Sequence, residues 1–215
     1  MELTTDAFVA RLGALSTPVR MGDIFALARE FTDLPIDGIE RLLRSPEHHQ
    51  RVGALSIMGK QFTHRTTTEA RRAELFELYL RRTDHINTWD LVDLSGHHVV
   101  GGYLFDKPRD VLYELARSGD WWERRLAIFA TLHFVRKGQV DDTFAIADIL
   151  IHDDEEYVNK AVGGLLREAG KVDRSRLIGF LDRHAATAPR VTLRAAIEHL
   201  DPPLRQHYLG LGRTR

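Results

Sequence analysis

A tryptophan and a carboxylate four residues apart form the pattern with the clearest chemical use in this sequence. Trp89 and Asp93 share one face of any helix that spans them. A carboxylate can stabilise a developing positive charge, and an indole attracts a cation to its π face. Two interpretations are open: the pair projects into a site, or Trp89 packs in the core while Asp93 pairs with a neighbouring arginine.

Trp122 and Arg125 lie three residues apart in a later segment and also share a helix face. Asp120 precedes them and is suited to cap that helix. If the face lines the same concavity as Asp93, Arg125 can anchor a phosphate or hold the carboxylate in its charged form. The alternative is an arginine on the solvent-exposed surface.

A third segment places two cations and a glycine on one stripe. Lys160, Gly164 and Arg167 occupy positions i, i+4 and i+7 of a predicted helix. Glycine inside a helix is unfavourable by about 1 kcal/mol relative to alanine, so the Gly163-Gly164 pair needs a reason. Close packing against another helix is the simplest one.

Several classes of chemistry are excluded by what the sequence lacks. It contains no cysteine, no glycine-rich phosphate loop and no Gly-x-Ser-x-Gly motif, so thiol catalysis, nucleotide hydrolysis and serine hydrolysis are not expected. The histidines His48-His49 and His97-His98 are adjacent, and adjacent side chains on a helix point to different faces. We therefore expect no metal site and no cofactor.

Length and charge set further limits. The 215 residues suit one domain or a short repeat array, and 30 Lys+Arg nearly balance 31 Asp+Glu. A net charge of -1 argues against a uniformly basic nucleic-acid binder, but charge gathered on one face still allows phosphate contacts. No apolar run approaches the roughly 18 residues that span a bilayer, and no targeting segment opens the chain. We therefore expect a cytoplasmic protein without membrane contact.

Helical periodicity runs through almost the whole chain and predicts an all-α protein of antiparallel helix pairs. One apolar stripe ends at Ser45-Pro46, where the proline disfavours further helix and the next helix is expected to begin. This stripe consists of Ile36, Ile39, Leu42 and Leu43, and the same spacing recurs at Leu75, Leu78 and Tyr79 and at Val111, Leu112 and Leu115.

A basic residue followed by small and apolar residues recurs at Arg51, Arg125, Lys160 and Arg194. The intervals are 74, 35 and 34 residues, so the first interval accommodates two units of about 37 residues, close to known helical repeats. The missing unit should lie near position 88, where residues 87–93 carry polar and aromatic side chains instead of core alanines. We expect a helical solenoid whose second helices line one concave face, with the site in this unusual unit.

Three motifs, in order along the chain, resemble the DNA alkylation repair enzyme family, the AlkD-like DNA glycosylases. They span residues 84–93, 121–128 and 153–168, and the likeness continues through residues 188–198. The similarity covers about residues 21–208 in total.

The resemblance implies a right-handed α-solenoid of HEAT-like antiparallel helix pairs with a concave basic face. It implies a single domain over residues 1–215, with an N-terminal helix in 1–20, repeats in 21–209 and a flexible tail in 210–215. The implied partner is alkylated double-stranded DNA, bound by a monomer.

The resemblance also assigns roles. Trp89, Asp93 and Arg125 match the family's catalytic cluster, which faces the deoxyribose of the lesion and excises cationic N3- or N7-alkylated purines without base flipping. An alkylated purine already carries positive charge, so it leaves without a general acid, and one carboxylate can stabilise the oxocarbenium-like sugar. The residues expected to contact DNA are Trp122, Lys160, Arg167, Arg194 and Arg51.

The sequence departs from the family at Gly164, where active relatives usually carry an aromatic residue. Loss of a stacked aromatic removes about 1 to 3 kcal/mol of contact energy, by analogy with base stacking. The near-neutral net charge is a second departure. The alternative function is therefore a catalytically weak or inactive helical-repeat module that binds DNA structures or a protein partner.

Overall fold

The computed structural model describes residues 3–211, and these residues form helices and turns without any strand. The prediction of an all-α protein is confirmed. The chain divides into two compact units, residues Met1–Tyr103 (unit 1) and Leu104–Arg215 (unit 2). No helix within residues 3–211 combines the length and the apolar character needed to cross a bilayer.

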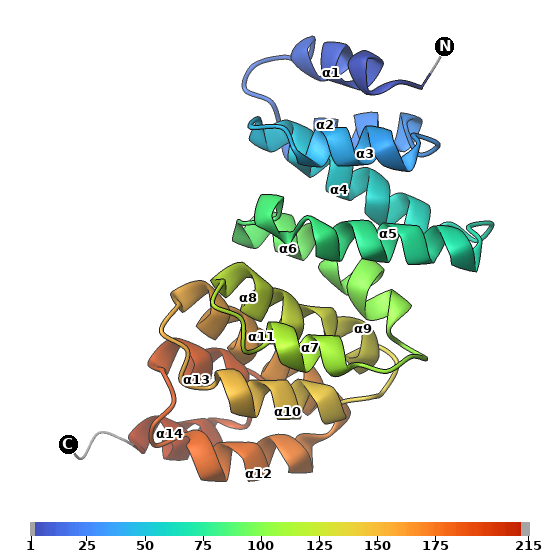
Figure 1. The fold of residues 1–215 in the computed structure, drawn as a ribbon. Helices are drawn as coiled ribbons and strands as arrows, with labels where there is room; N and C mark the ends of the chain where they lie inside the picture. Colours follow the sequence, from blue (N-terminus) through green and yellow to red (C-terminus); the bar gives the residue numbers. More distant parts are fainter. Residues whose placement is uncertain (1–2, 212–215) are drawn as a thin grey trace. The chain divides into compact units, whose positions relative to one another are not determined.

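Unit 1 holds the first eight helical elements, drawn in blue to green in Figure 1. An N-terminal helix was expected within residues 1–20, and the first element occupies the middle of that range. The elements are α1 (Thr5–Gly13), α2 (Met21–Glu30), α3 (Ile36–Leu43), α4 (His48–Thr63), α5 (Glu69–Arg81), the 3-10 turn η1 (Thr83–His85), α6 (Trp89–Gly96) and the π turn η2 (His97–Gly101).

Unit 2 holds the remaining helices (Figure 1). The tail expected in residues 210–215 lies partly outside the residues that the structure describes, which end at Leu211. The helices are α7 (Asp110–Leu115), α8 (Trp121–Ala130), α9 (Leu132–Val135), α10 (Asp141–Leu150), α11 (Glu156–Val172), α12 (Arg174–His184), α13 (Arg190–Ala196) and α14 (Pro202–Gly210).

One long helix forms the centre of each unit. In unit 1, α4 packs against α2, α3, α6 and η2, and its residues from Val52 to Met58 are all buried. Gly53 permits the close approach of Phe8 from α1, because a Cβ at Gly53 would lie 2.3 Å from the Phe8 ring. In unit 2, α11 packs against α8, α10, α12 and α13. Helices next to each other in sequence also pair, as α3 does with α4 and α10 with α11.

Local sequence signals account for several helix ends. Helix α3 ends at Leu43 and α4 begins at His48, so the predicted break at Ser45-Pro46 is confirmed. The hydroxyl of Thr4 accepts a hydrogen bond from the Ala7 amide, which satisfies one of the free donors at the start of α1. Thr68 caps α5 in the same way, by accepting from the Arg71 amide at 3.2 Å.

The basic residues of the repeat pattern occupy nearly the same position in their helices. Arg51 is the fourth residue of α4, whereas Arg125, Lys160 and Arg194 are the fifth residues of α8, α11 and α13. They therefore lie near the start of the second turn of their helices. The fifth residue of α6 is Asp93. A carboxylate thus stands in the unusual unit where the other units carry a cation.

Candidate functional site

Helix α6 presents Trp89 and Asp93 in its first two turns. Trp89 is the first residue of the helix, and 47% of its surface is exposed. Asp93 follows one turn later and is half-buried, while Leu91 and Val92 between them point into the core. The interpretation that Trp89 packs in the core is therefore wrong. An exposed indole and a carboxylate lie on neighbouring turns of one helix.

The charge of Asp93 affects the pKa of a buried phenol on the neighbouring helix α5. Tyr79 of α5 is fully buried, and its hydroxyl donates a hydrogen bond to the Val92 carbonyl of α6 at 3.4 Å. Burial, with the negative charge of Asp93 added to it, raises the pKa of the Tyr79 phenol well above its usual value. Tyr79 therefore stays protonated and holds α5 against the helix that carries Asp93.

The start of α6 is held by a second carboxylate, Asp90. Its Oδ1 accepts a hydrogen bond from the Thr88 hydroxyl at 2.7 Å, and its Oδ2 lies 2.7 Å from Nε2 of His48 at the start of α4. Burial opposes ionisation, but the hydrogen bonds from Thr88 and His48 outweigh it and hold the pKa of Asp90 below its usual value. Sequence analysis did not identify His48 or Asp90 as residues that position α6, because they lie 42 residues apart.

Arg51, which is expected to contact DNA, forms hydrogen bonds with the loop that precedes α6. Its Nη1 donates to the His85 carbonyl at 3.2 Å and to Oδ1 of Asn87 at 3.1 Å. The guanidinium is half-buried, and its Nε is enclosed without an acceptor among the described residues. These bonds give Arg51 a structural role beside Trp89, and its contact with DNA stays a prediction.

A cavity of about 710 Å³ lies in unit 2 between α8, α9 and α11. Its apolar floor includes Phe129, Leu132 and Leu165, and its charged groups are five cations and one carboxylate. The predicted stripe on α11 is confirmed, because all three of its members line this cavity. The charged lining residues are Arg125, Arg136, Lys160, Arg167, Lys171 and Glu168.

Arg125 and Lys160 occupy one end of the unit 2 cavity. Arg125 is buried; its Nη1 donates to the Tyr157 carbonyl, and its guanidinium carbon lies 5.9 Å from the ring centroid of Phe129. The interpretation of Arg125 as an exposed surface arginine is therefore wrong. Lys160 is exposed and pairs with Glu156 at 2.6 Å, which raises the pKa of its amine.

The other cations of the cavity differ in how far their charge is compensated. Arg167 pairs with Glu198 and with Glu168, and the hydrogen bond from Glu198 is the main reason that the pKa of Arg167 is raised. Lys171 also pairs with Glu168, at 2.8 Å. Arg136 is exposed and has no ion pair within residues 3–211.

The two adjacent glycines of α11 have different surroundings. A Cβ at Gly163 would lie 2.6 Å from the Thr192 carbonyl oxygen and 2.8 Å from the Ala195 Cβ, so α13 approaches α11 closely there. A Cβ at Gly164 would meet nothing within 4 Å, and this residue faces the cavity. Close helix packing therefore explains Gly163 and does not explain Gly164.

Trp122 and Arg194 lie outside this cavity's lining. Trp122 is half-buried, its ring lies edge-on to Trp121 at 5.9 Å, and its indole N–H is enclosed without an acceptor among the described residues. Asp120 occupies the cap position before α8, but its side chain makes no capping hydrogen bond. Arg194 is exposed on α13 and forms no ion pair in the described part of the chain.

The rings of His97 and His98 lie side by side, with centroids 3.8 Å apart. This corrects the expectation that adjacent histidines point to different faces. The two residues begin the π turn η2, and a widened turn reduces the angle between successive side chains. Within residues 3–211, no three histidine or acidic side chains come together as a metal site.

Paired helices built around α4 and α11 define an α-helical repeat protein. A family model described as DNA alkylation repair enzyme matches residues 15–200, which is most of the chain. The protein therefore belongs to the DNA alkylation repair enzyme family. No curated protein matched the chain.

Proposed function

We propose that this protein is a DNA glycosylase that excises cationic N3- or N7-alkylated purines from duplex DNA, acting as a monomer. The observation that carries the proposal is the exposure of Trp89 one turn before Asp93, in a chain of the DNA alkylation repair enzyme family. An exposed tryptophan at the start of a helix contributes little to the core, so a ligand-binding role accounts for it better than packing does.

The chemistry needs few protein groups. An alkylated purine carries a positive charge before the reaction, and breaking the N-glycosidic bond returns the bonding electron pair to the base, which leaves as a neutral molecule. The deoxyribose becomes oxocarbenium-like, and the carboxylate of Asp93 stabilises that charge until water adds to C1′ and releases a proton. Trp89 offers its π face to the cationic base or sugar.

Arg125 has a separate role in this proposal. Its Nη1 donates to the Tyr157 carbonyl, which orients the guanidinium at the cavity, and a guanidinium is the group best suited to bind a backbone phosphate. Phosphate contacts of this kind fix the register of the strand without reading its sequence. Lys160 and Arg167, which line the same cavity, extend this anion-binding surface.

The test is base release from a duplex that contains N7-methylguanine, with protein in excess so that slow product release does not hide the chemical step. Asp93→Asn should lower the rate on the order of 100-fold, as removal of one electrostatic stabiliser does in other enzymes. The matched control is Asp84→Asn, which makes the same change at an exposed carboxylate of the preceding turn. Equal rates for Asp93→Asn and the wild type would refute the role of Asp93.

A second candidate function is a catalytically weak or inactive module that binds DNA structures or a protein partner. It is favoured by Gly164, which leaves the cavity open, and by the carboxylates that already compensate Lys160 and Arg167. It predicts duplex binding without base release, or no duplex binding at all. A salt titration separates the two forms, because phosphate contacts give a steep loss of affinity with salt.

Gly164→Trp tests whether the missing aromatic residue limits catalysis, as the second candidate function assumes. A Cβ at Gly164 would meet nothing within 4 Å, so a tryptophan side chain can leave the helix there without a backbone clash at its Cβ. The substitution places an aromatic group in the cavity. If the missing aromatic limits catalysis, the variant should release base faster than the wild type. An unchanged rate would show that Gly164 does not account for weak activity.

A further inference from the structure

A second group of cations surrounds a hollow of about 620 Å³ in unit 1, at the ends of α2 and α4. Three of its lining residues, Arg29, Lys60 and Arg65, carry positive charge, and none carries a carboxylate. We call these three residues the Lys60 cluster. The remaining lining residues are Thr32, Thr63 and His64.

The charge of the Lys60 cluster is not compensated by the protein. Arg29 and Arg65 are exposed, and neither forms an ion pair or a side-chain hydrogen bond within residues 3–211. The amine of Lys60 donates to the Ser56 hydroxyl at 2.9 Å and lies 5.9 Å from the ring centroid of Phe25, and neither group carries a negative charge. Burial and the positive charge of Arg29 lower the pKa of the Lys60 amine.

Most other cations described above differ from this cluster. In unit 1, Arg11 pairs with Glu30 at 2.8 Å and Arg41 pairs with Asp6 at 2.7 Å. In unit 2, Lys160 has the opposite pKa shift to Lys60, because it is paired with Glu156. In a chain with a net charge of -1, three uncompensated cations around one hollow form a local anion-binding surface.

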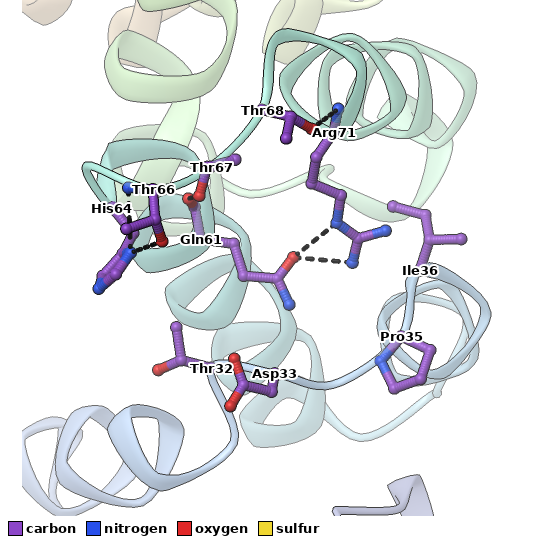
Figure 2. Close-up of a pocket in the computed structure, with 10 residues that line it drawn as sticks. All are labelled: Thr32, Asp33, Pro35, Ile36, Gln61, His64, Thr66, Thr67, Thr68 and Arg71. Atoms are coloured by element: carbon purple, nitrogen blue, oxygen red, sulfur yellow. Dashed lines mark hydrogen bonds between the residues drawn. The ribbon is translucent and has the colours of Figure 1, made fainter.

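An adjoining hollow of unit 1 shares Thr32 and His64 with the hollow of the Lys60 cluster (Figure 2). It contains Arg71, a cation whose donors are bound by other groups of the protein. There the guanidinium of Arg71 is turned toward Gln61, and its Nη2 donates to the side-chain oxygen of Gln61 at 2.8 Å (Figure 2). Arg71 also pairs with Glu74 at 3.0 Å. Its donors are thus used within the protein, unlike those of Arg29 and Arg65.

The threonines beside the cluster do not supply donors. The Thr32 hydroxyl donates to the Arg29 carbonyl at 2.7 Å, and the Thr63 hydroxyl donates to the Gly59 carbonyl at 2.8 Å. Charge attraction and the N–H groups of the cations therefore determine which ligand fits. An anion with several negatively charged oxygens satisfies them, as a phosphate does.

Lys60 connects the cluster with the helix that carries Asp93. It also lines a smaller hollow of about 230 Å³, together with Phe25 of α2, Leu94 of α6 and His98 of η2. Leu94 directly follows Asp93 in α6. Lys60 thus lines two hollows of unit 1, one with Arg29 and Arg65 and one with the proposed catalytic helix.

We propose that Arg29, Lys60 and Arg65 form a binding site for backbone phosphates of duplex DNA, next to the helix that carries Asp93. The identity of the ligand as DNA rests on the proposed function. The hollow is larger than a single phosphate group, and its cations come from two helices and a loop, so consecutive phosphates of one strand fit it better than a free anion does.

The first experiment measures the affinity for an undamaged duplex across a range of salt concentrations. In the test variant, Arg29, Lys60 and Arg65 are each changed to Gln. In the matched control, three cations of unit 1 that already have carboxylate partners are changed to Gln, so both variants lose the same net charge. The control cations are Arg11, Arg41 and Arg81.

Each lost phosphate contact lowers the slope of log affinity against log salt by about 0.9. We expect the slope to fall by about 2 to 3 in the test variant and to stay near the wild-type value in the control. Equal slopes for the test variant and the wild type, equal losses in both variants, or no duplex binding by the wild type would each overturn the proposal.

The two proposals fail in distinguishable ways. If the slope depends on the Lys60 cluster but no base is released, the glycosylase proposal is wrong and the phosphate site stands. If base is released and the slope does not depend on the cluster, the phosphate site is wrong and the glycosylase proposal stands.

A second readout uses the unsubstituted chain and separates backbone phosphate from free phosphate. The chain has five lysines, so carbon-13 methylation gives a short set of amine signals, and Lys60→Arg assigns the signal of interest. Duplex should shift the Lys60 signal and raise the pKa of its amine, whereas inorganic phosphate at the same phosphate concentration should not. Lys107, paired with Asp106 in unit 2, is the control signal. An equal response to inorganic phosphate would overturn the backbone assignment.

Discussion

Gly163 and Gly164 of α11 allow two matched substitutions with opposite expected effects on stability. A Cβ at Gly163 would lie 2.6 Å from the Thr192 carbonyl oxygen and 2.8 Å from the Ala195 Cβ, which is closer than real Cβ contacts come. A Cβ at Gly164 would have nothing within 4 Å. Gly163→Ala should therefore destabilise the protein, and Gly164→Ala should stabilise it.

The size of each effect follows from two contributions. Alanine in place of glycine inside a helix is favourable by about 1 kcal/mol, and this gain applies to both variants. At Gly163 the neighbour is a backbone oxygen, so α13 must shift, and overpacking of this kind costs about 1 to 3 kcal/mol. Gly164→Ala should thus raise the free energy of unfolding by about 1 kcal/mol. The difference between the two variants isolates the steric contribution and should be about 1 to 3 kcal/mol.

Urea denaturation followed by circular dichroism measures both free energies of unfolding. Thermal denaturation gives a second measure, since 1 kcal/mol corresponds to about 2 to 4 °C in a chain of this size. Equal changes in the two variants, or a Gly163→Ala protein more stable than Gly164→Ala, would refute the argument that α13 approaches α11 at Gly163.

Two further predictions concern ion pairs. The hydrogen bond from Arg81 lowers the pKa of Glu40 despite partial burial of the carboxyl, with Arg82 adding to the effect. A lowered pKa stabilises the fold above the unfolded pKa of about 4.3, and this contribution is lost as pH falls through the lower folded pKa. Glu40→Gln should therefore cost about 1 kcal/mol at pH 7 and nothing near pH 2, measured by urea denaturation at both pH values. Arg124 donates to Asp153 at 2.6 and 3.0 Å, and the Asp153 side chain is 5% exposed. Arg124→Ala should cost about 3 kcal/mol because it leaves a buried charge unpaired, and a double variant with Asp153→Ala should recover part of the loss if that reason is correct.

Local sequence signals determined the helices and the side chains that share a face. The break at Ser45-Pro46 and the buried stripe of α5 follow from neighbours within a few residues, and both are found in the structure. The stripe of Lys160, Gly164 and Arg167 likewise lines one cavity, as its spacing predicts. These features depend on the period of the α-helix, which a sequence carries in full.

The direction in which a face points was decided only by the tertiary structure. Spacing placed Trp89 and Asp93 together but did not decide between core and surface, and the packing of α6 against α4 left Trp89 exposed. Spacing placed Gly164 on the stripe with Lys160 and Arg167, but it did not show that α13 approaches Gly163 and leaves the space at Gly164 open.

The sequence also did not predict which carboxylate pairs with which cation. Arg167 is compensated by Glu198, 31 residues away, whereas Arg29 and Arg65 have no carboxylate partner among the described residues. Composition gives the total charge of the chain, but the residues that neutralise a given cation come from other helices. Sequence spacing fixes which side chains leave a helix together, and only the packing of helices fixes what they meet.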